Sequence, residues 1–166
     1  YKGSHNGHYY YLANNTDTWT NASQNCVNVG GYLTAIGNLA ENNFINSLIN
    51  SSVWIGFNDL VTEGTFVWTN GEPVSYTNWH PGEPNNQGNE DYTEMYATGL
   101  WNDLPASSSL PYILEIDNFI PSSSLLWSTG DTTASITVSP NQNTTYYVTQ
   151  PNNGVSCTDS ITVTVN

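Results

Sequence analysis

The stretch of sequence that says most about the fold is WHPGEPNNQGNEDYTEMYATGLWND, residues 79–103. Its clustered negative charges must be neutralised or solvated when the chain folds. It carries five carboxylates and four asparagine amides, and it contains no lysine or arginine. Like charges this dense repel one another when the chain folds, unless a cation neutralises them. Carboxylate and amide oxygens are the ligands of a hard cation, and Ca²⁺ takes about 6–8 of them. From spacing alone, a calcium-binding loop and a solvated acidic loop are equally good interpretations.

The acidic cluster reaches upstream of this stretch, since eight of the 14 acids lie between Asp59 and Asp103. Thiolates and imidazoles, which Zn²⁺ prefers, are nearly absent from the same region, so a hard cation is the better match. Residues 69–91 show little periodicity and are rich in Gly, Pro, Asn and Glu. A loop of this length inside a compact domain is usually functional or held by a ligand.

The composition of the whole chain excludes several classes of partner. The 166 residues carry one Lys or Arg against 14 acids, a formal net charge of −13. Nucleic acids and anionic membrane surfaces require a field of basic residues, which Lys2 alone cannot supply. No apolar run approaches the roughly 20 residues of a membrane-spanning helix, so we expect no membrane insertion. The polar surface, rich in Asn, Thr and Ser, favours an extracellular protein.

Periodic patterns predict two helices and several strands before residue 117. The first helix has apolar residues at spacings of three and four behind a polar cap: Trp19, Ala22, Cys26 and Val29 follow Asp17 or Thr18. The second begins at Asn38, with Glu41 in the position of a capping box. Aromatic and β-branched segments predict strands at residues 8–12, 53–57, 65–68, 92–97 and 112–116. The fold class is therefore α+β, with two helices, antiparallel strands and a long polar loop.

The composition changes near residue 117, which divides the chain into 1–117 and 118–166. Pro121 and the serines that follow it have the composition of a linker. Beyond them, short alternating segments predict strands at residues 125–127, 134–138, 145–149 and 160–165. Four strands are fewer than the roughly seven of a complete sandwich, so we expect a small, partial all-β segment.

Four motifs in the first part, taken in order, resemble the C-type lectin domain: Trp54-Ile55-Gly56-Phe57-Asn58-Asp59, Glu83-Pro84-Asn85, Asn89-Glu90-Asp91 and Trp101-Asn102-Asp103. The resemblance extends from about residue 8 to residue 116. It implies a C-type lectin-like fold for residues 1–117. It also implies calcium-dependent carbohydrate binding in the long loop.

The resemblance implies two calcium sites. One Ca²⁺ at the sugar site would be bound by Glu83, Asn85, Glu90, Asn102 and Asp103, and the same residues would contact the sugar. Two adjacent hydroxyls of a mannose-, glucose- or fucose-type glycan would complete its coordination. The family's peptide bond before the motif proline is cis, so a cis Glu83–Pro84 bond is expected. A second, structural Ca²⁺ would be bound by Asp59, Glu63, Asn86 and Asp91.

The cysteines depart from the family pattern. Cys26 and Cys157 are far apart in sequence, and their spacing does not decide whether they pair. The resemblance implies that the usual partner of Cys26 is replaced by Leu114, and that Tyr92 and Ala106 replace the second bridge. Without these bridges, the loop depends more on metal ligation for its order.

The sequence favours a binding protein over an enzyme. It contains no serine elbow and no Cys/His pair that would supply a nucleophile. A carboxylate that binds Ca²⁺ stays ionised and is a poor general acid. His5 and His8 are spaced like metal ligands, but their position near the chain terminus favours a frayed segment. Trp19, Trp54, Trp68 and Trp101 are expected in the core.

Residues 118–166 resemble the C-terminal half of an immunoglobulin-like module of Bacteroidetes-type surface adhesins. A sheet that lacks its first strands exposes an edge, so a strand of a neighbouring chain would complete it. The sequence therefore predicts a secreted or cell-surface adhesin whose partners are glycans. The alternatives are a structural subunit of an extracellular filament or stalk built by strand complementation, and an ice- or protein-binding surface on the same fold.

Overall fold

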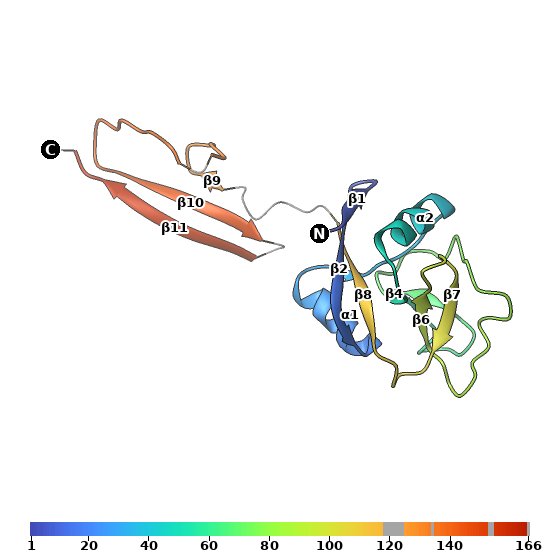
Figure 1. Cartoon of the computed structure of the whole chain (residues 1–166). Coiled ribbons are helices and arrows are strands. Elements are labelled where there is room, and N and C mark those ends of the chain that lie inside the picture. The colour runs from blue at the N-terminus through green and yellow to red at the C-terminus, as the bar shows by residue number, and fades with distance from the viewer. Residues whose placement is uncertain (118–124, 134, 153–154, 166) are drawn as a thin grey trace. The chain divides into compact units, whose positions relative to one another are not determined.

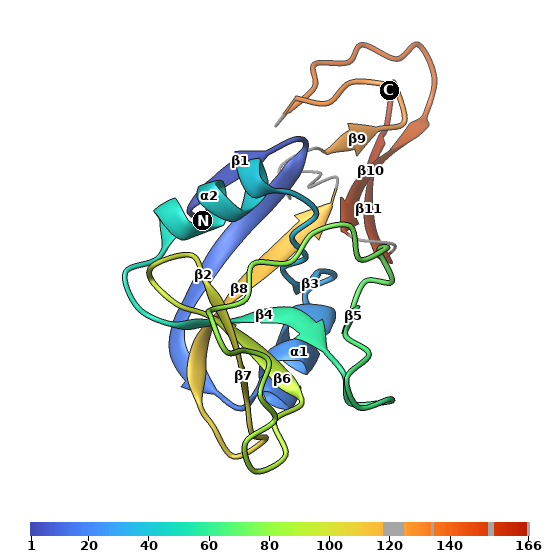
Figure 2. The same cartoon turned by 90° about the vertical axis from the view of Figure 1, so that its right-hand side faces the viewer.

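The computed structural model describes residues 1–117, 125–133, 135–152 and 155–165. Contacts divide the chain into two units, Tyr1–Asn118 and Phe119–Asn166, whose elements are labelled in Figures 1 and 2. Within the described ranges, neither helix has the length and apolar character needed to cross a membrane.

The two predicted helices are confirmed, together with the residues that cap them. Helix α1 (Trp19–Asn28) begins at Thr18, whose hydroxyl accepts a hydrogen bond from the Asn21 N–H at 3.4 Å. Helix α2 (Leu39–Leu48) begins at Asn38, whose side chain accepts from the Glu41 N–H at 3.0 Å. Both caps satisfy a backbone donor that the first helical turn leaves without a partner.

One mixed sheet organises the first unit. Its strands are β1 (Gly3–His5), β2 (His8–Asp17), β3 (Tyr32–Leu33), β4 (Val53–Asn58), β5 (Val67–Trp68), β6 (Tyr92–Met95), β7 (Trp101–Leu104) and β8 (Leu110–Asp117). The order is β1-β2-β8-β4-β6-β7, with β3 added to β8 and β5 added to β4. The β4–β8 pair is parallel and the others are antiparallel. Figure 2 shows β2, β8 and β4 in the middle of the unit.

Strand β4 is buried along its whole length and separates two apolar clusters. Ile55 and Phe57 pack with Trp68 and Trp101, while Trp54 packs with Trp19 of α1 on the other side. Successive side chains of a strand point to opposite faces, which accounts for this division. The expectation that the four tryptophans belong to the core is confirmed, since all four are buried.

One strand of the first unit is not predicted from the sequence, and one sequence-based expectation is wrong. The segment 101–104 forms strand β7, for which the sequence predicts no element. His5 and His8 are not frayed, because they pair with each other in the β1–β2 hairpin. The turn between them places Asn6 and Gly7 at φ values of 48° and 90°, which asparagine and glycine tolerate best.

The second unit contains a three-stranded antiparallel sheet. Its strands are β9 (Leu126–Trp127), β10 (Thr144–Asn152) and β11 (Val155–Val163), in the order β11-β10-β9. The predicted strand at 134–138 is wrong for residues 135–138, which form none, while residue 134 lies outside the described residues. The alternating sequence of residues 135–138 is typical of a strand, but no strand among the described residues pairs with this segment.

Candidate functional site

Strands β6 and β7 form the floor of the site. Their register pairs Glu94 with Asn102 and Thr93 with Asp103. The Asn102 amide donates to the Glu94 carboxylate at 3.0 Å, and both side chains are buried. Because the Asn102 amide nitrogen is held by Glu94, its oxygen stays available to a ligand.

The Asp103 carboxylate fastens the long loop to this floor. Its two oxygens accept hydrogen bonds from the backbone N–H groups of Asn85 and Asn86, at 3.1 and 2.8 Å. Asp103 is only 1% exposed. Hydrogen bonds to an ionised and buried acceptor are among the strong ones in proteins. One buried side chain therefore sets the position of the Glu83-Pro84-Asn85 turn.

The loop closes on itself through its own amides. The Asn86 side chain accepts from the Glu90 N–H at 2.7 Å, while the Gln87 N–H donates to Asn85 and Glu90 side chains at 2.8 and 2.9 Å. Asn86 adopts a φ of 46°, which asparagine tolerates. The Glu83–Pro84 bond is cis, as expected from the motif. The loop leaves β5 and returns beside β6 and β7 (Figure 2), where Trp79 forms a bridge to Trp101.

The site concentrates negative charge that the chain itself does not neutralise. Burial, followed by the interaction with the neighbouring Asp103 carboxyl group and the charge of Glu90, raises the pKa of Glu83. Burial and the charges of Asp103 and Glu94 likewise raise the pKa of Glu90. One Glu83 oxygen is buried without a hydrogen-bond partner among the described residues. Carboxylate and amide oxygens are the ligands of a hard divalent cation. Ligand oxygens of Glu83, Glu90 and Asp103 do not all lie within 4.8 Å of one another, so a cation would have to draw them closer.

A second acidic cluster lies beside the first. Asp59, only 2% exposed, accepts from the Gly64 N–H at 2.7 Å with one oxygen, and its other oxygen is buried without a partner among the described residues. Its backbone N–H donates to the Asp91 carbonyl at 3.2 Å. Partial desolvation and the charges of Asp59 and Asp91 raise the pKa of Glu63, which also hydrogen-bonds to Asn86. The structure thus places Asp59 next to Asp91 and Glu63 next to Asn86, but ligand oxygens of Asp59, Glu63 and Asp91 do not all lie within 4.8 Å of one another.

Glu94 is the residue at this site that the sequence analysis missed. Tyr92, Thr93, Glu94 and Met95 are all buried, so a glutamate stands in a fully buried strand. The sequence offered one signal for a role of Glu94: it is an acid within the predicted strand 92–97, eight residues before Asn102.

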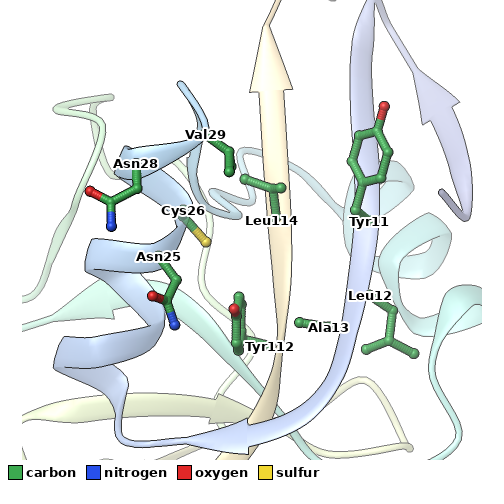
Figure 3. Close-up of a pocket in the computed structure, with 9 residues that line it drawn as sticks. All are labelled: Tyr11, Leu12, Ala13, Asn25, Cys26, Asn28, Val29, Tyr112 and Leu114. Atoms are coloured by element: carbon green, nitrogen blue, oxygen red, sulfur yellow. The ribbon is translucent and has the colours of Figure 1, made fainter.

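An apolar cavity lies elsewhere, between α1 and strands β2 and β8. It has a volume of about 340 Å³, and Figure 3 shows Cys26 and Leu114 both lining it. Its lining includes no carboxylate, in contrast to the loop. Cys26, whose pairing the sequence left open, is a free and buried thiol in the structure, and burial raises its pKa to about 12.

The two helices, the mixed sheet and the acidic loop define a C-type lectin-like fold. The family model for the lectin C-type domain matches residues 15–115, and the chain belongs to this family. Residues 118–166 lie outside this match, and nothing in the comparisons supports their immunoglobulin-like resemblance.

The relatives are receptors and sugar-binding proteins by name. The chain is 44% identical over 103 residues to the low affinity immunoglobulin epsilon Fc receptor of Mus musculus, covering 61% of this chain and 31% of that protein. It is 43% identical over 91 residues to the mannose-binding protein of Gallus gallus, covering 54% of this chain and 36% of that protein. The chain therefore spans about a third of the length of these relatives.

Solved structures share the fold. A calcium-independent type II antifreeze protein aligns with a TM-score of 0.67 at 33% identity, covering 69% of this chain and 90% of that one. The carbohydrate-recognition domain of cow CD23, solved in the presence of a GlcNAc2Man3 oligosaccharide, aligns with a TM-score of 0.65 at 34% identity, covering 67% and 88%.

Proposed function

We propose that residues 1–117 bind mannose-type glycans in a calcium-dependent manner, through Glu83, Asn85, Glu90, Asn102 and Asp103. The observation that carries this proposal is the unpaired buried oxygen of Glu83, which lies in a loop fastened by Asp103. A buried carboxylate oxygen without a partner is costly unless a ligand satisfies it. Ca²⁺, when bound, supplies the positive charge that holds the sugar hydroxyls at this point.

In the proposed site, the carboxylates would accept hydrogen bonds from the sugar and the asparagine amides would donate them. Glu83 and Glu90 accept hydrogen bonds from two adjacent hydroxyls of the sugar. Asn85 and Asn102 donate to the same hydroxyls, and Asn102 has a second N–H for this beyond the one that Glu94 accepts. Five side-chain oxygens and the Asp103 carbonyl leave room for two hydroxyls among the roughly eight oxygens of a Ca²⁺ shell. Equatorial neighbouring hydroxyls, as in mannose, glucose and fucose, would fit this arrangement.

Asp59, Glu63, Asn86 and Asp91 would bind a second, structural Ca²⁺. The Asn86 side chain would be a ligand of this second ion. The Asn86 backbone N–H donates a hydrogen bond to Asp103 of the first site. Filling the second site would therefore stabilise the same turn that forms the first.

The proposed role is binding without catalysis, in a secreted or cell-surface adhesin. Carboxylates committed to a cation are held ionised, which removes the general acid that glycoside hydrolysis requires. A glycan array, run in Ca²⁺, in chelator and again in Ca²⁺, tests this function. We expect mannose-type glycans to bind, to be lost in chelator and to return. Chelator-resistant binding, or a preference for galactose, would contradict it.

Ice binding on the same fold is a second candidate, favoured by the similarity to an antifreeze protein described as calcium-independent. The two functions separate on chelation. An ice-binding surface would keep thermal hysteresis in EDTA, whereas the sugar site would lose its ligand. The unpaired carboxylate oxygens of the loop favour the calcium-dependent function.

The second unit, residues 118–166, would serve as a partial immunoglobulin-like stalk segment completed by a neighbouring chain. Among the described residues, β11 pairs with β10 alone, and Ile161 on β11 is 60% exposed. A cavity of about 290 Å³ opens on the same sheet between Trp127, Tyr146 and Val163. Strand addition along β11 would form a filament or stalk. Concentration-dependent sedimentation tests this, and a monomer at all concentrations would contradict it.

A further inference from the structure

A polar cluster lies on one face of the sheet, away from the acidic loop. In the register of β2 and β8, His8 is opposite Asp117 and Tyr10 is opposite Glu115, while β3 places Tyr32 opposite Glu115. Directly paired residues of neighbouring strands project from the same face of a sheet. Five polar side chains from three strands therefore meet at one place.

His8, Glu115 and Asp117 are close enough to share one ligand. The His8 Nδ1 lies 2.8 Å from Glu115 Oε1 and 2.6 Å from Asp117 Oδ1. Nitrogen and oxygen atoms of the three residues all lie within 4.8 Å of one another. The Tyr32 hydroxyl contacts the same two carboxylate oxygens, at 3.0 and 2.6 Å, and so fixes their orientation.

The chain balances the charge of the cluster only in part, through His8, whose pKa is raised because the effect of burial is outweighed by the charges of Glu115 and Asp117. Glu115 is 1% exposed, and burial raises its pKa to about 7. Tyr10 connects it to a third acid, since its hydroxyl lies 3.0 Å from Glu41 and 3.4 Å from Glu115. Lys2 is the only Lys or Arg in the sequence, so His8 is the one side chain here that can become a cation. A buried carboxylate beside further acids is stabilised by a positive charge brought from outside.

We propose that His8, Glu115 and Asp117 form a site for a divalent transition-metal ion such as Zn²⁺, separate from the acidic loop. Imidazole nitrogen and carboxylate oxygen are both ligands of Zn²⁺, and a site with three protein ligands leaves the fourth position to water. Bonds of about 2.0–2.2 Å in a tetrahedron separate ligand atoms by about 3.3–3.5 Å. The side chains would therefore move apart by somewhat less than an ångström. The His8 and Asp117 side chains are 31% and 48% exposed, which gives the ion and its water a route to the site.

The site explains why an imidazole stands in this position. A calcium site would be built from oxygens alone, as in the acidic loop, whereas imidazole nitrogen is a preferred ligand of Zn²⁺ and similar ions. Binding would tie the first residue of β2 to the last residue of β8, at the boundary of the first unit.

The test is a Zn²⁺ titration of the full chain, without a histidine tag and with Ca²⁺ in saturating excess. We expect one Zn²⁺ per chain by calorimetry, and a Co²⁺ absorption spectrum of tetrahedral intensity. His8→Asn should weaken Zn²⁺ binding by more than about tenfold, and Tyr32→Phe should weaken it by about tenfold through the loss of ligand orientation. His5→Asn is the matched control, because His5 is the cross-strand partner of His8 but stacks on Phe44, with ring centroids 5.0 Å apart.

Asp117→Asn provides a second variant with little risk to folding, since this side chain is half exposed. Loss of Zn²⁺ binding in both ligand variants, with binding kept in His5→Asn, would support the site. No uptake by the wild-type chain in Ca²⁺, or equal uptake by His8→Asn, would overturn it. Sugar binding by His8→Asn in Ca²⁺ is expected to be unchanged, so this site and the sugar site are tested independently.

Discussion

Replacing Asp103 with asparagine removes the side chain that fastens the long loop. The substitution keeps the shape of a side chain that is 1% exposed. Its single oxygen can accept one of the two N–H groups of Asn85 and Asn86, now at 3.1 and 2.8 Å, and its amide nitrogen faces the other. A hydrogen bond to a charged group contributes about 1.5–3 kcal/mol, so losing one and weakening the other costs about 3 kcal/mol. These bonds exist before the metal binds, so the Ca²⁺ affinity falls through the loss of the charged ligand that Asp103 would supply; a loss of about 3 kcal/mol at this ligand makes Ca²⁺ binding about 100-fold weaker, because about 1.4 kcal/mol is a factor of ten.

Calorimetric titration of Ca²⁺ into metal-free protein measures this loss. Asp131→Asn is the matched control, because this exposed aspartate of the second unit also accepts a hydrogen bond, from the Thr129 hydroxyl at 2.7 Å, and lies outside the loop. Melting curves add a second readout. The charge of Asp103 raises the pKa of Glu83 and of Glu90, so its removal relieves repulsion when no metal is bound. The melting temperature of Asp103→Asn should therefore fall less in EDTA than in Ca²⁺. A Ca²⁺ affinity within about threefold of wild type would refute the reasoning.

Three further predictions concern the sugar preference, the pH dependence and the free thiol. The double change Glu83→Gln with Asn85→Asp exchanges the hydrogen-bond acceptor and donor at constant size and charge. Mannose binding should therefore weaken about ten- to hundredfold, and galactose binding should rise. An unchanged sugar ranking with Ca²⁺ still bound would count against the site. In EDTA, the free energy of unfolding should fall as the pH rises from about 5 through about 7, because burial raises the pKa of Glu115 from 4.5 to about 7 and the folded state then holds more protons than the unfolded state. Thermal melts from about pH 5 to 8 check this, and a free energy of unfolding that rises over this range would contradict it. Cys26 should resist alkylation in the native protein because burial raises its pKa to about 12, and mass mapping of a modified Cys26 before unfolding would contradict this.

Local signals predicted the helices well. Thr18 and Asn38 cap α1 and α2 because an extended residue with a side-chain oxygen satisfies the first free N–H groups, whatever the rest of the chain does. The ligand set from Glu83 to Asp103 was implied by the resemblance to the C-type lectin domain and not by the acidic composition, which suits a solvated loop equally well, and it stays a prediction.

Strand pairing and buried polar contacts were harder to predict from the sequence, because they depend on residues far apart in the chain. Segment 101–104 becomes a strand only because β6 pairs with it, and segment 135–138 has a strand pattern with no such pairing among the described residues. Glu115 looked like an ordinary residue of a predicted strand, yet Thr34 and Tyr32, more than 80 residues away in sequence, hydrogen-bond to it. The one local signal was its position two residues after the buried Ile113, on the side of the strand that faces the core.

Calcium-dependent sugar binding is tested most directly by titrating methyl α-mannoside into the wild-type chain in Ca²⁺, in EDTA and after Ca²⁺ is restored. We expect one site per chain in Ca²⁺, no binding heat in EDTA and full recovery, because Glu83, Glu90 and Asp103 can hold the hydroxyls only when a cation balances their charge. Equal binding in EDTA, or none in Ca²⁺ while the loop still takes up the ion, would contradict a sugar site on these residues.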